Sequence, residues 1–380
     1  MGRIETHLSL SVAFLLGLLF LNGCSGFGHS TEPAGTSSDR SGLPSIQPQA
    51  QYLYLPSSTS SIAGFAINSS TGLLTPLSGS PYSTFGNSMA QTVVEDPAGG
   101  FLFVGNVPSY PHGQQEGDPS ISIFKRDLST GILSLVQSNL PIRPDPGSLA
   151  VDQSGHFLYT YGDSRGGHVF AIDQANGTLT EINGSPFPIL LGGELFAHPT
   201  MPFLYSVSDF GFRVYAYRLD QTTGAPLPLP GSPFSISGEF PAADAVDPTG
   251  QFLYVLNDAP GPNLEIFRIQ SDGTLSKVPG SPFQVGNGGI SLATSPSGDF
   301  LFVSTSGDSN DLYSLRVDRS TGQIKSISQV GVQDQSLTIR GIDVSGRFLY
   351  ATAGNGFFLF AIDSTTGALT FEGPAIASIR

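Results

Sequence analysis

The stretch DPTGQFLYVL, Asp247–Leu256, joins a tight-turn sequence to a run of aromatic and aliphatic residues. Asp first, Pro second and Gly fourth is the signature of a type I turn, and the residues after it are typical of a β-strand. The aromatic–Leu–aromatic triplet that follows the turn recurs along the chain at intervals of 46 to 56 residues. It opens at Tyr52, Phe101, Phe157, Phe203, Phe252, Phe300 and Phe348. A period of this length is typical of a repeat architecture.

Each repeat contains four short segments with strand character. In the unit around the quoted stretch, these segments are Ala242–Asp247, Phe252–Leu256, Leu264–Ile269 and Thr274–Val278. Four strands within about 48 residues match the spacing of an antiparallel meander, and such a meander repeated around a ring is a propeller blade. The seven triplets therefore predict an all-β fold over residues 51–380: a seven-bladed β-propeller of four-stranded antiparallel blades.

The two ends of the chain are expected to complete one blade together. The first unit begins at its second strand, at Tyr52, whereas the last unit leaves Ala375–Arg380 unused. This leftover segment is one strand long, and we predict that it pairs with the Tyr52 strand and closes the ring. Closure would remove the open sheet edges that promote aggregation, and deletion of the segment should cause a large loss of stability.

A tetrapeptide, GSPF or GSPY, marks four of the repeats. We expect it to follow the fourth strand of a blade, with Gly and Pro turning the chain toward the axis and the aromatic ring packing under the neighbouring blade. In the second and sixth units the motif has drifted. The copies are Gly79–Tyr82, Gly184–Phe187, Gly231–Phe234 and Gly280–Phe283.

The N-terminus predicts export. Leu8–Leu21 is an apolar run of 14 residues, too short for a comfortable transmembrane helix and suited to a signal peptide. Leu21-Asn22-Gly23-Cys24 resembles the bacterial lipobox, which implies removal of residues 1–23 and lipid attachment at Cys24. Residues 24–50 would then be a flexible tether, and the protein would be anchored in the cell envelope. An ordinary signal peptide or a buried cysteine remains the alternative.

Charge and composition exclude several classes of function. The net charge is −14, from 16 Lys and Arg against 30 Asp and Glu, and no basic stripe is present, so nucleic-acid binding is disfavoured. The single cysteine permits no disulfide within the chain. No histidine has metal-ligand spacing and no nucleotide-binding motif occurs, so we expect neither a metal nor another cofactor. We expect a monomer.

The repeat markers DPTGQFLYVLN, AIDSTTGALT and GSPF resemble those of the lactonase-family propellers. That group includes the propeller-type 6-phosphogluconolactonases and the carboxymuconate lactonizing enzymes. The resemblance covers about residues 50–380, and it implies a lactone-hydrolysing propeller. The same repeat markers occur in surface propellers without known activity, and a fold alone does not determine function.

The catalytic positions that the resemblance implies are largely changed in this chain. The family's active members carry a His that falls here at Gly193, and an Arg-His pair that falls at Ala242-Ala243. The family's Glu falls at Asp258. The loop Ser208–Arg213 keeps the family's Asp and Arg, at Asp209 and Arg213.

Opening a lactone requires a base to activate water and a cation or N–H donors to stabilise the oxyanion. Asp258 is the first candidate for the base and Glu194 the second, and Arg213 is the candidate cation. Asp209 is a further candidate from the same loop. Each has a plainer interpretation: Asp258 in a turn, Glu194 in a solvated channel, and Arg213 paired with Asp209 at the surface.

Two hypotheses therefore stand side by side. The first is an exported, lipid-anchored lactone hydrolase acting on a small lactone or sugar-derived ligand. The second is a non-catalytic scaffold propeller that binds a ligand or an envelope protein. The insert at residues 107–119 is an alternative binding element, because long loops often carry function.

Overall fold

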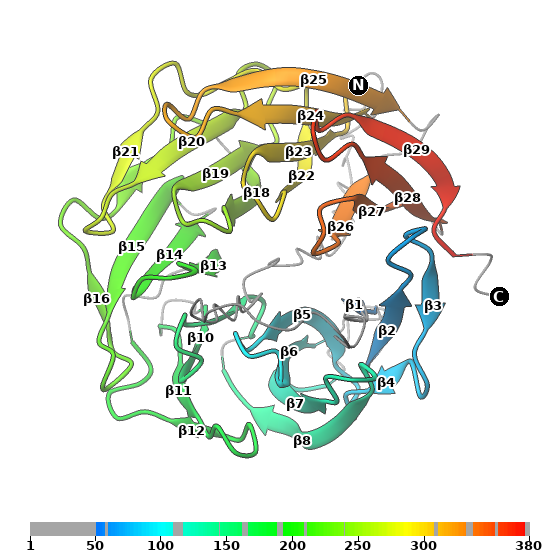
Figure 1. Ribbon diagram of the computed structural model, residues 1–380. Coiled ribbons are helices and arrows are strands. Elements are labelled where there is room, and N and C mark those ends of the chain that lie inside the picture. Colours follow the sequence, from blue (N-terminus) through cyan, green and yellow to red (C-terminus); the bar gives the residue numbers. More distant parts are fainter. Residues whose placement is uncertain are drawn as a thin grey trace, which may run out of the picture.

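The computed structural model describes residues 51–57, 60–108, 117–143, 145–161, 166–187, 193–208, 211–238, 240–307, 311–331, 337–353 and 356–376. These residues form seven antiparallel sheets arranged as blades around a central axis, which confirms the predicted seven-bladed propeller (Figure 1). No helix occurs among the described residues, so none there could span a membrane.

The strands follow the chain blade by blade. Blades one to three consist of β1 (Gln51–Pro56), β2 (Ser61–Ile67), β3 (Leu74–Pro76) and β4 (Tyr82–Ser83); β5 (Met89–Glu95), β6 (Phe101–Val107), β7 (Ser120–Arg126) and β8 (Leu133–Pro141); and β9 (Leu149–Val151), β10 (Phe157–Thr160), β11 (Val169–Ile172) and β12 (Leu179–Glu181).

Blades four and five consist of β13 (Glu194–Ala197), β14 (Phe203–Ser208), β15 (Arg213–Leu219), β16 (Pro226–Pro228) and β17 (Phe234–Ser235); and β18 (Pro241–Val246), β19 (Phe252–Asn257), β20 (Leu264–Ile269) and β21 (Leu275–Lys277). Blades six and seven consist of β22 (Gly289–Thr294), β23 (Phe300–Thr305), β24 (Asp311–Val317) and β25 (Ile324–Gly331); and β26 (Thr338–Ile342), β27 (Phe348–Ala353), β28 (Gly356–Ile362) and β29 (Leu369–Pro374). In blades two to seven the first strand lies nearest the axis (Figure 1).

The aromatic triplets hold neighbouring blades together. The third residue of a triplet, such as Tyr159, donates its hydroxyl proton to the carbonyl of a turn glycine in the next blade, here Gly224, at 2.9 Å. The first aromatic of the same triplet, Phe157, packs against that glycine, where a Cβ would overlap its ring. The glycine also needs its positive φ of 78°, so the turn sequence and the triplet are parts of one contact.

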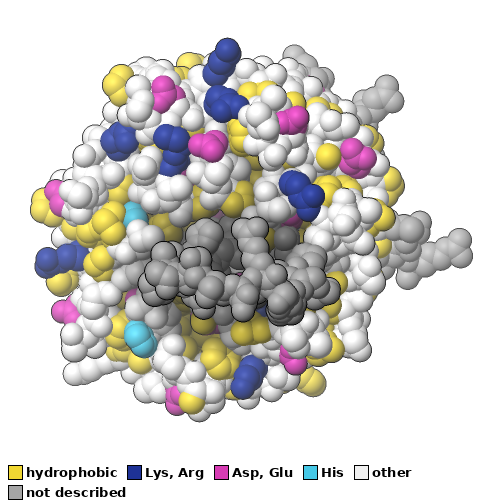
Figure 2. Space-filling model, viewed as in Figure 1, with side chains coloured by type: hydrophobic (Ala, Val, Ile, Leu, Met, Phe, Trp, Pro, Cys, Tyr) yellow, Lys and Arg dark blue, Asp and Glu magenta, His cyan; other side chains and the backbone are white. Residues whose placement is uncertain are grey.

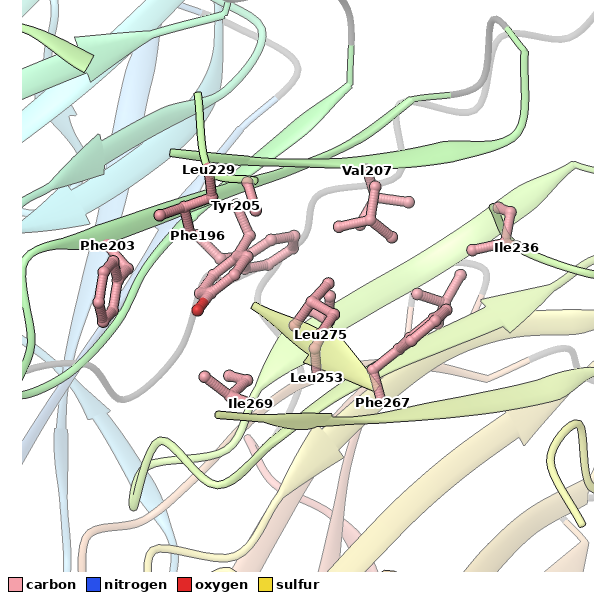
Figure 3. Close-up of a cluster of buried hydrophobic side chains, with 13 residues drawn as sticks. Phe196, Phe203, Tyr205, Val207, Leu229, Ile236, Leu253, Phe267, Ile269 and Leu275 are labelled. Atoms are coloured by element: carbon pink, nitrogen blue, oxygen red, sulfur yellow. The ribbon is translucent and has the colours of Figure 1, made fainter. Parts of the chain in front are cut away.

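The core follows the same arrangement, because each buried cluster spans two blades. In the cluster between blades four and five, Phe203 and Tyr205 of one blade meet Leu253 and Phe267 of the next (Figure 3). The blade interfaces therefore carry most of the apolar burial, which is the main favourable term in folding.

The ring closes through the same type of contact. Tyr350 in blade seven donates to the carbonyl of Gly72 in blade one at 2.8 Å, and Arg347 donates to the carbonyl of Ser69. Ala375, which is 1% exposed, follows β29 and accepts a hydrogen bond from Leu74 at 3.2 Å. Residues 377–380 of the predicted closing strand lie outside the described residues, so its pairing with β1 stays a prediction.

The GSPF motif interrupts the outer strand instead of following it. After Gly231–Phe234 the chain returns to the third strand of the same blade, where β17 pairs with β15 beyond the end of β16. The serine hydroxyl of the motif, on Ser232, accepts a hydrogen bond from the Ala216 N–H in the gap at 2.9 Å. The aromatic residue, Phe234, packs into the interface with the next blade as expected. Blades two and six, which lack the motif, have long uninterrupted outer strands, β8 and β25.

A carboxylate at the boundary of blades one and two makes stability depend on pH. Glu95, at the end of β5, pairs with Arg126 at the end of β7. Burial raises the pKa of Glu95 to about 7, although the attraction of Arg126 acts in the opposite direction. A carboxyl whose folded pKa is raised stabilises the fold below its unfolded pKa, and this contribution is lost as the pH rises through 7.

We therefore expect the stability of the Glu95→Gln variant to increase relative to that of the parent protein as the pH rises. From pH 5 to pH 8, urea unfolding should show the free energy of unfolding of the variant rising relative to the parent by about 1–3 kcal/mol. A difference between the two proteins that stays constant across this range would contradict the prediction.

Candidate functional site

Six of the seven blades contribute residues to the central channel. Residues of β5, β9, β13, β18, β22 and β26 surround a cavity of about 90 Å³ at its centre. The lining is mostly aliphatic, and among its described residues three are charged: Asp244 on β18, Asp247 in the turn after β18, and Arg340 on β26. Asp247 is fully buried, and its carboxylate is used by the turn itself, where it accepts the N–H groups of Thr249 and Phe252. Asp244 and Arg340 are the other two charged residues of the described lining.

Bulges in the inner strands turn single side chains out of the strand pairing. In β5, β18 and β22 the extra residue lies at the same register position near the start of the strand, and in β26 it lies deeper. A bulge re-aims a side chain, and bulges are common beside functional sites. The four extra residues are Gln91, Ala242, Ile290 and Arg340.

Arg340 is held in position within the channel wall. Its Nε donates to the Thr352 hydroxyl on the neighbouring strand at 2.7 Å. Burial lowers the pKa of Arg340, but a guanidinium stays charged in proteins. Asp244 is 7% exposed and lies opposite Val255 in the sheet. A carboxylate and a guanidinium in a poorly hydrated cavity interact more strongly with a ligand than they would at the surface.

The residues predicted from the sequence lie at one face of the ring. Glu194 is the first residue of β13, Arg213 is the first residue of β15, and Asp258 follows the end of β19. The first and third strands of a blade begin where the second ends, so all three belong to the same face. None of them lines the central cavity; Arg213 and Asp258 are exposed, and Glu194 is partly buried.

Arg213 is separated from the channel by the width of the blade. Glu194 pairs with Val207 of β14, and Arg213 pairs with Ser208 on the other side of the same strand. Two strand spacings, about 10 Å, therefore lie between the backbones of Glu194 and Arg213. Asp209 and Cys24 lie outside the described residues, as do residues 109–116 of the predicted insert.

At the position of the family's histidine, the backbone conformation of this chain allows only glycine. Gly193 has a φ of 128°, and a Cβ there would overlap the carbonyl oxygen of Val207. No side chain fits at this position without a shift of β13 or β14. At the family's Arg-His position, Ala243 is 1% exposed and packs in the core between blades five and six. The family's catalytic pattern is therefore absent from these positions in geometry as well as in sequence.

The buried histidine has a structural role. His198 Nδ1 accepts hydrogen bonds from the N–H groups of Thr200 and Met201, and Nε2 faces the Gly250 carbonyl at 3.0 Å. Burial lowers its pKa, which favours the neutral ring that this pattern requires. Among the described residues, no group of three His, Cys, Asp or Glu side chains could hold a metal ion.

Sequence reasoning missed Asp244 and Arg340. Each is the single charged residue within a first strand, in PAADAV and in TIRGI. First strands also carry Glu95 and Glu194, so a single charge in such a strand does not by itself mark the channel. The depth of Arg340 depends on a bulge, which the sequence does not announce.

The charges on the visible face of the ring are dispersed. Figure 2 shows Lys and Arg side chains spaced singly among polar and hydrophobic ones, with Asp and Glu between them. Such a surface offers no continuous track for a nucleic-acid backbone.

No family model matches the sequence, and no curated protein matches it. Solved structures do match. The periplasmic gluconolactonase PpgL of Pseudomonas aeruginosa is 19% identical with a TM-score of 0.66, over 87% of this chain and 97% of that one. A candidate 6-phosphogluconolactonase from Bacteroides fragilis is 19% identical with a TM-score of 0.65, over 87% and 96%.

A propeller with a binding role also matches. Sqt1 of Chaetomium thermophilum, solved with the N-terminus of ribosomal protein L10, is 16% identical with a TM-score of 0.51, over 74% of this chain and 75% of that one. At these identities the comparisons show the fold alone: the chain is a seven-bladed propeller with the fold of lactonase-like proteins.

Proposed function

We propose that this protein hydrolyses a small, uncharged lactone in its central channel. One observation carries the proposal: a carboxylate, Asp244, and a guanidinium, Arg340, line the same largely aliphatic cavity. These are the two groups that lactone opening requires, a base for water and a cation for the oxyanion.

The reaction assigns one role to each group. Asp244 takes a proton from a water molecule, whose oxygen attacks the lactone carbonyl carbon. Arg340 stabilises the negative charge that develops on the carbonyl oxygen. The ring C–O bond then breaks, the proton passes to the leaving oxygen, and the product is the open hydroxy acid. The aliphatic walls limit competing water and strengthen both electrostatic interactions.

Size and charge both point to the substrate class. The cavity is small, at about 90 Å³, so it favours a small lactone ring over a bulky sugar phosphate. The net charge of −14 also repels an anionic substrate.

The residues predicted from the sequence take secondary roles in this proposal. Glu194 lies at the start of an inner strand and is the alternative base if the lactone binds at the channel mouth. Asp258 and Arg213 would act at the rim of the same face, and Asp209, which lies outside the described residues, stays a candidate from the sequence alone. Exposed charges at a rim are screened by water and salt, so we rank them below Asp244 and Arg340.

The direct test is an assay of lactone opening by the purified full-length protein. Acid release from γ-butyrolactone, glucono-δ-lactone and 6-phosphogluconolactone would be followed with a pH indicator, after subtraction of the spontaneous rate. We expect hydrolysis of a neutral lactone and little of the phosphorylated one. A rate equal to the spontaneous rate for all three compounds would contradict the proposal.

A non-catalytic scaffold is the second candidate, and one observation favours it. The backbone at Gly193 excludes the side chain that active family members carry there. In this case the channel would bind a ligand without converting it. A lactone that is bound in calorimetry but recovered unchanged would support this alternative.

We also propose that the protein is exported and lipid-anchored through Cys24. The support is the apolar run Leu8–Leu21 followed by the lipobox-like Leu21–Cys24, and a structural neighbour that is periplasmic. The Cys24→Ser variant should lose incorporation of radiolabelled palmitate and move from the membrane to the soluble fraction. Unchanged membrane association of this variant would contradict the anchor.

A further inference from the structure

A second hollow, here named the blade-two pocket, lies away from the central channel. It has a volume of about 440 Å³ and is formed by residues 86–88, 117–120, 139 and 141–143. These segments lead into β5, lead into β7 and leave β8, so the pocket lies on the same face as the predicted rim residues. Its volume is within the range of about 300–1,000 Å³ that is usual for small-molecule sites.

The walls of the blade-two pocket are lined with uncharged hydrogen-bonding groups. The Ser88 hydroxyl donates to the carbonyl of Asp118 at 2.7 Å, and the Ser120 hydroxyl donates to Asn139 Oδ1 at 3.4 Å. Ser88 is 4% exposed and its hydroxyl oxygen can still accept hydrogen bonds. Ser120 is 3% exposed, and its oxygen already accepts from Asn106 Nδ2 at 3.4 Å and keeps one lone pair. The Asn139 amide adds two donors. Closely spaced donors and acceptors of this kind match the hydroxyl groups of a sugar.

The charged groups at the pocket compensate each other. Arg143 and Asp118 form an ion pair at 3.0 Å, and their side chains are 64% and 79% exposed. An exposed ion pair of this kind contributes little to stability. Arg143 and Asp118 can therefore give up their mutual contact and bind the hydroxyl groups of a ligand instead. Because the two charges cancel, the pocket does not select for an anion or a cation.

An exposed aromatic residue in a strained conformation is the sequence neighbour of a pocket residue, although it does not itself line the pocket. Phe85 precedes the lining residue Gly86, is 56% exposed and has a φ of 53°. Asn139, on another wall, has a φ of 52°. A bulky residue in this region is a genuine outlier, and such residues gather at ligand sites. An exposed phenyl ring offers the flat apolar face on which the C–H side of a pyranose can stack.

A buried amide beneath the pocket lacks a donor. Asn106 is 1% exposed, and its Nδ2 donates to the hydroxyls of Ser122 at 2.9 Å and of Ser120 at 3.4 Å. Its Oδ1 is buried and accepts no hydrogen bond from the part of the chain that the structure describes. Such acceptors are rare in proteins, and Asn106 touches a residue that lines the pocket.

We propose that the blade-two pocket binds a neutral pyranose sugar. The hydroxyl and amide groups of Ser88, Ser120 and Asn139 bind the sugar hydroxyls, and Phe85 stacks on one ring face. The pocket is separate from the channel, so this proposal does not depend on lactone hydrolysis.

The test is titration of the full-length protein with glucose, cellotetraose and maltotetraose by calorimetry, with gluconate as the charged comparison. We expect saturable binding of a neutral sugar and none of gluconate, because gluconate is an open chain without a pyranose ring to stack on. Binding of glucose itself would indicate a free sugar as the ligand, and binding of a tetrasaccharide alone would indicate a glucan chain.

Phe85→Gly is the decisive variant. Glycine accepts the positive φ without strain, so the melting temperature should stay equal or rise, while the sugar affinity should fall by about fivefold or more. The control is Phe240→Gly, which relieves the same strain at a φ of 57° and 63% exposure but lies in the connection to β18. It also removes an edge-to-face contact with Phe212 at 5.7 Å, so its melting temperature is measured beside its sugar affinity. Its sugar affinity should be unchanged.

Two outcomes would overturn the proposal. One is the absence of binding by all three neutral sugars. The other is binding that persists at parental affinity in both Phe85→Gly and Arg143→Met, because the sugar would then lie elsewhere on the protein.

Discussion

Replacing Asp244 with Asn should lower kcat/KM for lactone hydrolysis by about a hundredfold to a thousandfold. Asn has the size of Asp and makes hydrogen bonds, so the channel wall should keep its packing. It cannot accept the proton of the attacking water, however, so the chemical step loses its base. The loss should therefore appear in kcat with little change in KM.

Arg340→Met should lower kcat/KM by a similar factor, because the oxyanion would lose the guanidinium that stabilises its charge. Its effect should be almost entirely on kcat if Arg340 meets the charge only as it develops. Arg340 also binds Thr352, so the melting temperature of this variant should be measured beside its kinetics. A variant that unfolds at the assay temperature would be replaced by Arg340→Lys, which keeps the charge but loses the fixed planar geometry.

The predicted rim residues supply the matched comparison. Asp258→Asn and Arg213→Met remove the same chemical groups from exposed positions on the same face. We expect each to change kcat/KM by less than about threefold, because exposed charges contribute little. A large loss of kcat/KM in Asp258→Asn, together with an unchanged kcat/KM in Asp244→Asn, would mean that Asp258 is the base, as predicted from the sequence.

The fold was predictable because its determinants are local and repeated. The turn at Asp247–Gly250 and the triplet at Phe252–Tyr254 mark one blade. The seven copies of the triplet give the number of blades in the ring. The strands expected around them, Phe252–Leu256 and Leu264–Ile269, agree with β19 and β20 to within one residue. Repetition turns a weak local signal into a strong one.

The site was less predictable because it depends on register. Arg340 enters the channel wall through a bulge in β26, and a bulge adds one residue without a sequence marker that distinguishes it from a regular strand. The exclusion of a side chain at Gly193 is likewise set by the approach of Val207 from the neighbouring strand. Both facts are tertiary, and comparison of single positions with a family could not reveal them.

The GSPF motif lies between these cases. Its aromatic residue was expected at a blade interface and is found there, whereas its place within the outer strand was not foreseen. The distinction rests on the Ser232 hydroxyl, which satisfies the strand N–H of Ala216 where the strand pairing is broken. When a side chain takes the place of a backbone hydrogen-bond partner, the break in the outer strand cannot be recognised from the lengths of the strand-like segments in the sequence.

Gly72→Ala should lower the free energy of unfolding by about 3–5 kcal/mol, because the added methyl group would crowd the contact that closes the ring. Gly72 has a φ of 73°, and a Cβ would lie 2.6 Å from the ring of Phe348 in blade seven. The added carbon would push the two blades apart and weaken the hydrogen bond from Tyr350.

Two further glycines separate the causes of this loss. Gly261 has a φ of 100° with nothing within 4 Å of an added Cβ, so Gly261→Ala measures backbone strain alone, about 1 kcal/mol. Gly273 meets Phe203 at the same 2.6 Å, but it joins blades four and five, which the chain itself connects. Gly273→Ala therefore measures strain and crowding without opening the two ends.

The excess loss in Gly72→Ala over Gly273→Ala then reports ring closure. Blades one and seven are far apart in the sequence, so a gap between them is not limited by a short linker, and the effective concentration of the two surfaces falls when the contact weakens. Hydrogen exchange should accelerate in β2 and β28 of Gly72→Ala but not in β19. Equal losses in the two variants, with exchange spread evenly over the ring, would mean that closure depends on contacts other than the one between Tyr350 and Gly72.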